Sequence, residues 1–75
     1  MNETMYKISR TKLICKHVEM HGLSIIGYSI YFKIRRTWYT TRVFTTVTDA
    51  LNHDGEWVYT VTREYAKDLN KVVKS

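Results

Sequence analysis

Residues 23–36, LSIIGYSIYFKIRR, carry the clearest structural pattern in this chain. The even positions from Ile26 to Ile34 are apolar without a break, whereas the odd positions include Gly27 and Lys33. Successive side chains of a β-strand point to opposite faces, so a period of two is typical of a strand. The pattern predicts a long strand whose even residues face the core.

The segment before this strand is predicted to form a hairpin with it. Gly22 takes the positive φ of a tight turn without steric cost, and it follows His21 directly. Pairing across that turn sets Val18 opposite Ile25 and Cys15 opposite Tyr28. This register assigns to the core face Leu13, Cys15 and His17, and to the opposite face Lys12, Ile14, Lys16 and Val18.

The segment after the strand is predicted to form a second hairpin. A turn at Arg36–Thr37, or a four-residue loop of the same register, keeps the aliphatic residues of both strands on one face. Neither turn residue suits the positive φ of common hairpin turns, so this prediction depends on the pattern alone. The register sets Arg35 across from Trp38, Arg42 across from Tyr31, and Ile30 across from Val43.

A fourth strand is predicted at residues 56–62, after the turn signal Asp54–Gly55. Two connections between the third and fourth predicted strands are possible. Thr48 could cap a short helical turn, or the third strand could continue to residue 54. We prefer the helical turn. It does not fix which residues of the fourth strand face the core, so Trp57, Tyr59 and Val61 can be buried.

The last segment is predicted to be a helix capped by Thr62. Its apolar residues follow the spacing of one helical stripe, which comprises Tyr65, Leu69, Val72 and Val73. The first ten residues are left as an edge strand or an ordered arm. Together these elements predict one α+β domain over residues 1–75, an antiparallel sheet of about four strands with the helix on its core face; a small closed barrel is the alternative.

Length and composition limit the function. A chain of 75 residues has a thin core, which argues against a deep active-site cleft. Its single cysteine excludes an internal disulfide, and residues 1–4 lack the features of a signal peptide, so we expect a cytoplasmic setting. The longest apolar-rich run, Leu23 to Ile34, is shorter than the ~20 residues that span a bilayer, so no membrane partner is predicted.

Catalysis, metals and cofactors are not predicted. Cys15, His17, His21 and His53 lack the paired spacing of zinc ligands, and the register buries Cys15 in the core row. Residues 53–56 are explained by a tight turn, and no glycine-rich phosphate loop is present. The sequence therefore predicts a protein that is not an enzyme.

The face opposite the predicted core carries alternating basic and aromatic residues, which suit phosphates and stacked bases. With Arg36 from the turn, the predicted binding residues are Lys12, Lys16, Tyr31, Lys33, Arg35, Arg36, Trp38, Arg42 and Phe44. The same residue types also occur at protein interfaces and on solvated sheet faces. Ile14, Val18 and Ile25 form an apolar cluster there, which a second copy of the chain, a partner protein or the N-terminal arm could cover.

The formal charge of +5 favours an acidic partner. We therefore expect a small binding protein for RNA or single-stranded DNA. The alternative is a protein-binding accessory or inhibitor, of the kind that compact viral genomes encode, which docks on an acidic host protein. No recognised nucleic-acid-binding signature is present to choose between them.

Overall fold

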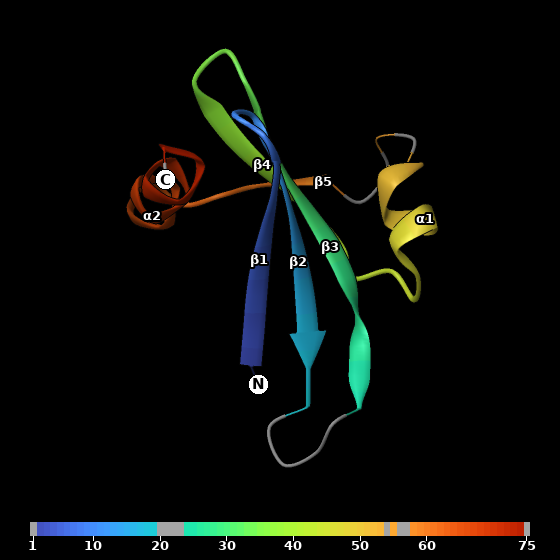
Figure 1. Ribbon diagram of the computed structural model, residues 1–75. Coiled ribbons are helices and arrows are strands. Elements are labelled where there is room, and N and C mark those ends of the chain that lie inside the picture. The colour runs from blue at the N-terminus through green and yellow to red at the C-terminus, as the bar shows by residue number, and fades with distance from the viewer. Residues whose placement is uncertain (1, 20–23, 54, 56–57, 75) are drawn as a thin grey trace.

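The computed structural model describes residues 2–19, 24–53, 55 and 58–74 of the chain. Its framework is an antiparallel sheet of five strands that lie side by side in chain order. The strands are β1 (Asn2–Ser9), β2 (Lys12–Val18), β3 (Ile25–Ile34), β4 (Thr37–Thr41) and β5 (Val58–Thr60). Two helices, α1 (Val47–Leu51) and α2 (Arg63–Lys74), lie on opposite sides of this sheet (Figure 1). The predicted α+β fold is confirmed, with β1 as an additional edge strand.

The main core lies between α2 and the sheet. The backbone N–H of Tyr65 donates to the Thr62 hydroxyl at 3.3 Å, which is the predicted N-cap. Leu69 and Val73 of α2 are buried against Leu13 of β2 and Trp38 of β4. The predicted apolar stripe of the last helix is therefore the stripe that covers the sheet.

The short helix α1 covers part of the other sheet face. Thr46 caps it by accepting a hydrogen bond from the Asp49 backbone N–H at 3.1 Å. Ala50 is fully buried, and α1 packs against β3, whose Ile30 is also buried. The predicted helical turn is confirmed, although its cap is Thr46 and not Thr48. In β5, Tyr59 is half exposed, contrary to its predicted burial, while Trp57 lies outside the described residues.

The predicted register of β2 on β3 is wrong along most of its length. Val18 pairs with Ile25 as predicted, but the next pair is His17 with Gly27, so Ile26 is an extra residue. This bulge moves Cys15 from Tyr28 to Ser29. One extra residue reverses which side chains share a face, so Leu13, Cys15 and His17 lie with the odd residues of β3 and not with the even ones.

The second hairpin turns one residue earlier than predicted. Ile34 pairs with Thr37 and Lys33 with Trp38, which leaves Arg35–Arg36 as a two-residue turn. This register differs from the predicted one by two positions, so residues keep their predicted faces although their partners change. Beyond Thr41, residues Arg42 and Val43 are exposed, and the bridge of Tyr28 with Phe44 restores the pairing.

Gly27 is required by the close approach of that bridge. A Cβ atom at this position would contact the carbonyl oxygen of Phe44 and would lie 2.6 Å from a methyl carbon of Val43. No side chain fits in that space without a backbone shift. The glycine thus fixes β3 against the segment that leads into α1.

Candidate functional site

The predicted binding face does not exist as one surface. Its aromatic residues Trp38 and Tyr31 belong to the core beneath α2, where Trp38 is only 1% exposed. The ring of Tyr31 lies 5.7 Å from the ring of Tyr65, in a tilted arrangement. Burial, followed by the hydrogen bond with Tyr65, raises the pKa of Tyr31 well above its usual range. The buried Trp38 ring offers no face to a base, and the partly buried Tyr31 ring packs against Tyr65, so these two residues do not form an exposed stacking platform.

The remaining predicted residues are distributed over different parts of the surface. Lys12 and Lys16 pair with Phe32 and Tyr28, so the bulge places them on the sheet face that α1 partly covers. Arg42 lies after β4, not across from Tyr31, and its guanidinium carbon lies 4.2 Å from the centre of the Phe44 ring. This cation–π pair is an internal contact of the segment.

Lys33, Asn70 and Trp38 form a polar network where β3, β4 and α2 meet. The Lys33 ammonium donates to Asn70 Oδ1 at 3.0 Å, and the Trp38 indole N–H donates to the same oxygen at 2.8 Å. The Lys33 ammonium also lies 5.8 Å from the centre of the Trp38 ring. The network satisfies the only polar atom of the buried indole and holds Lys33 at the edge of α2.

The β3–β4 turn presents two arginines in a strained conformation. Arg35 has φ of 49° and Arg36 has φ of 72°, and both side chains are exposed. A two-residue hairpin turn of this type requires positive φ at both positions, for which Asn-Gly is the favoured sequence. Residues with a Cβ adopt this conformation at a cost of ~1–2 kcal/mol each. Backbone strain of this kind is found at functional sites more than elsewhere.

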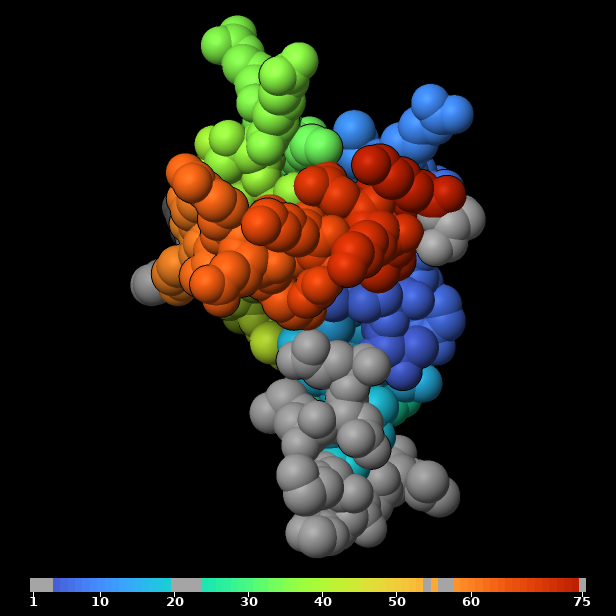
Figure 2. Space-filling model, turned by 90° about the vertical axis from the view of Figure 1, so that its left-hand side faces the viewer, coloured from blue at the N-terminus to red at the C-terminus, as the bar shows by residue number. Residues whose placement is uncertain are grey.

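The β1–β2 turn lies at the same end of the sheet. Ser9 pairs with Lys12, so Arg10 and Thr11 form the turn. The Lys33 backbone N–H donates to the Thr11 carbonyl at 2.8 Å, which joins this turn to β3 just before the arginine turn. Figure 2 shows the β1–β2 turn, in blue, and the β3–β4 turn, in green, projecting on the same side of α2.

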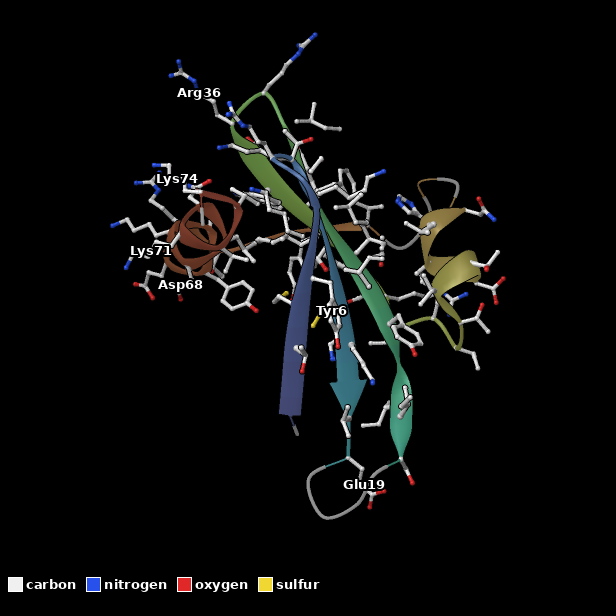
Figure 3. The ribbon with its side chains drawn as sticks, in the orientation of Figure 1. Tyr6, Glu19, Arg36, Asp68, Lys71 and Lys74 are labelled. Carbon is white, nitrogen blue, oxygen red and sulfur yellow. The ribbon has the colours of Figure 1, made fainter. Side chains whose placement is uncertain are left out.

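Helix α2 adds further cations to this end of the molecule. Arg63, Lys67 and Lys74 follow one another at spacings of four and seven residues, which places them on one side of the helix. Figure 3 shows Arg36 and Lys74 on the same side of the molecule, whereas Glu19 lies at the opposite end of the sheet. We call this region the basic end; its described members are Lys7, Arg10, Lys33, Arg35, Arg36, Arg63, Lys67 and Lys74.

Two hollows indent the basic end along the seam between α2 and the sheet. The first has a volume of about 370 Å³ and is lined by Arg10, Lys33, Asn70 and Lys74, together with Lys7 and Val73. The second has a volume of about 440 Å³, and its lining includes Arg36, Arg63, Trp38, Thr60 and Ala66. Within the described part of the chain, no carboxylate lines either hollow. Both hollows are therefore suited to anions.

Sequence reasoning missed Arg10, Arg63, Lys74 and Asn70 as site residues. The signal that could have located Arg10 is the turn between the first two strands, because adjacent hairpin turns at the same end of a meander lie close together. For Arg63 and Lys74 the signal is their helical spacing beside the buried stripe. Asn70 carries no sequence signal of its own, since only packing brings it to Trp38.

Half-buried rings lie on the sheet face opposite α2. The ring of Phe32 stacks on that of Tyr39 at 5.6 Å and on that of His53 at 5.5 Å. Lys12 pairs with Phe32 across the strands, so a cation lies beside this row. Of these residues, Phe32 belongs to the even row that the sequence assigned to the core, whereas Lys12 was assigned to the opposite face.

Cys15 and His17, the two strand residues that were considered for catalysis or metal binding, lie inside the protein. Cys15 is fully buried, and the Nε2 atom of buried His17 lies 2.8 Å from the hydroxyl of Ser29. A nucleophile enclosed in this way cannot contact a substrate. Among the described residues, no group of three or more metal-ligating side chains comes together.

The fold and the basic end define a small α+β protein with a cationic seam. Comparison of the chain with protein-family models, curated proteins and solved structures finds no match. Within the described segments, no helix has the length and apolar character needed to cross a membrane.

Proposed function

We propose that this protein binds single-stranded nucleic acid through the phosphate contacts of its basic end, without catalysis. The observation that carries the proposal is the convergence of two hairpin turns, the adjoining parts of β1 and β3, and one side of α2, which brings eight cations to one region. Phosphate groups meet cations in sequence-independent binding, and the affinity then depends steeply on salt.

The proposed contacts differ from those that the sequence suggested. Arg35, Arg36 and Lys33 remain as anion contacts, and Arg10, Arg63 and Lys74 join them. Trp38 and Tyr31 become supports, because the Trp38 indole holds Asn70 and the Tyr31 ring packs on α2. Base stacking is therefore not the main source of affinity, and we expect little discrimination among sequences.

The strain of the arginine turn supports a binding role. An Asn-Gly pair would relieve the strain, yet two exposed arginines occupy the turn, and Arg36 projects away from the sheet (Figure 3). Cationic side chains there are free of the core and can contact a large anion.

A fully buried Cys15 with no disulfide suits a reducing compartment, so we place this function in the cytoplasm.

The test is the binding of labelled oligothymidylate and oligouridylate, measured by fluorescence anisotropy at a series of salt concentrations. For single strands the slope of log affinity against log salt is about −0.7 for each phosphate neutralised. Replacement of Arg10 and Arg36 by alanine should make the slope shallower by about 1.4. Both side chains are exposed, so the fold should be unaffected.

The matched control replaces Lys16 and Arg42 by alanine, which removes the same charge away from the basic end. We expect this control to keep the slope of the wild-type protein. Absence of binding at about 50 mM salt, where such contacts are strong, would overturn the proposal. Capture of an acidic protein that persists after nuclease treatment, in that case, would favour the protein-binding alternative.

A further inference from the structure

The two hollows of the basic end are neighbours along α2, with the Lys33–Asn70–Trp38 network between them. Asn70 and Lys33 line the first hollow, and Trp38 lines the second. Ala66 in the second hollow and Val73 in the first are separated by two helical turns, about 10 Å along the helix axis. The hollows therefore open on the same side of α2, in a row.

The hydrogen bonds of Asn70 fix the orientation of its amide. Lys33 and the Trp38 indole are donors only, so both must contact the carbonyl oxygen of the side chain. The amide nitrogen, with two N–H donors, then points away from this network. Because Asn70 lines the first hollow, these donors are left for an acceptor that enters it.

The residues around the hollows match phosphate oxygens. Arg10, Lys33 and Lys74 supply charge to the first hollow, and the Asn70 amide supplies a neutral donor there. Arg36 and Arg63 supply charge to the second, and each guanidinium can contact two phosphate oxygens at once. Both volumes fall within the ~300–1,000 Å³ typical of ligand pockets.

We propose that the two hollows are phosphate subsites for one nucleic-acid strand, which follows the seam between α2 and the β3–β4 hairpin, and that Asn70 donates a hydrogen bond to the phosphate in the first hollow. This inference rests on the proposed function and assigns its subsites. A single strand bends into successive hollows, whereas the phosphates of a rigid duplex contact projecting side chains such as Arg35.

The sharpest test is Asn70→Asp. Aspartate keeps the acceptor for Lys33 and Trp38, but it replaces two donors with a negative charge at the first hollow. The matched control is Asn52→Asp, which makes the same charge change at the exposed end of α1, on the other side of the sheet (Figure 1). Affinity for oligothymidylate should fall by about tenfold more in Asn70→Asp than in Asn52→Asp, the loss of one hydrogen bond to a charged oxygen.

Two further variants test whether one strand occupies both hollows. Arg10→Ala with Lys74→Ala removes charge from the first hollow, and Arg36→Ala with Arg63→Ala removes it from the second. On a long oligothymidylate each pair should make the salt slope shallower by about 1.4, and the two pairs together by about 2.8. On a dinucleotide, which has one phosphodiester, the combined variant should lose no more than the stronger pair alone.

The outcomes separate this inference from the proposed function. If the wild-type protein binds no oligonucleotide, both fail. If it binds, but Asn70→Asp behaves like Asn52→Asp or one pair of variants leaves the slope unchanged, only the subsites are wrong. An equal loss on a duplex of the same length would overturn the assignment to a single strand. Thermal unfolding of each variant shows whether a loss reflects the hollow or the fold.

Discussion

The two faces of the sheet share the same strands but differ in how completely a helix covers them. Under the twelve-residue α2, Leu13 and Trp38 are almost inaccessible. On the opposite face the five-residue α1 covers Ile30, while Ile26 and Ile34 of the same strand remain about half exposed. The most regular apolar row of the sequence is therefore not the main core. A row of apolar side chains is fully buried where a helix covers it. Without that cover, even a regular apolar row stays partly exposed.

The largest expected effect tests this comparison at two adjacent residues of β4. Trp38→Ala removes a buried ring and the hydrogen bond to Asn70, which should lower the free energy of unfolding by about 3–5 kcal/mol. Tyr39→Ala, on the partly covered face, should cost about 1 kcal/mol, since one stacked ring contact is lost. Urea denaturation measures both; equal losses would show that the faces do not differ as described.

A smaller effect is expected where β3 meets the segment that leads into α1. Gly27→Ala introduces a methyl group against the Phe44 carbonyl and the Val43 side chain. We expect destabilisation by about 1–3 kcal/mol, because a backbone contact cannot relax as a flexible side chain does. Thermal unfolding detects this change, and Gly55→Ala, with φ of 95° and no atom within 4 Å of the added carbon, shows the cost of backbone strain without a steric contact. Wild-type stability of Gly27→Ala would contradict the close approach.

Substitution of the two arginines in the β3–β4 turn should raise the stability of the fold, in contrast to the losses expected above. Replacing Arg35 and Arg36 by Asn and Gly relieves part of the strain of two positive φ values; Gly also adds entropy to the unfolded chain, so the net gain in stability should be about 1–2 kcal/mol. The same variant should bind oligothymidylate more weakly, because two cations of the basic end are lost. Denaturation and anisotropy on the same sample test the pair of effects. Loss of stability in this variant would mean that the arginines serve the fold.

The smallest expected effect is a loss of stability at alkaline pH. Burial raises the pKa of Tyr31 above the value of about 10 that it has in the unfolded chain. Above pH 10 the unfolded state therefore releases a proton that the folded state keeps, and stability falls by less than about 1.4 kcal/mol per pH unit. Tyr31→Phe should flatten that decline between pH 10 and 11, relative to the wild-type protein. Urea titrations at several pH values make the comparison.

The sequence predicted the residue types of the candidate site better than their positions in the fold. Lys33, Arg35 and Arg36 lie in the basic end, but Lys12, Lys16 and Arg42 do not, and Trp38 lies in the core. The error has one main source. A single extra residue at Ile26 reverses the face of β2 relative to β3, and its signal in the sequence is Gly27 directly after it, because an isolated glycine within a strand pattern often marks a bulge.

Local sequence patterns were enough to predict strands where β2, β3, β4 and β5 form and to predict the last helix, because these depend on periodicity and on caps such as Thr62; β1 remained open between an edge strand and an arm. The sequence also determined which residues of β3 and β4 share a face, since the observed register differs from the predicted one by two positions. Which face α2 covers and which cations come together depended on tertiary packing. Those outcomes depend on a bulge, on the exact turn and on contacts between residues far apart in the chain, such as Trp38 with Asn70, which local periodicity does not encode.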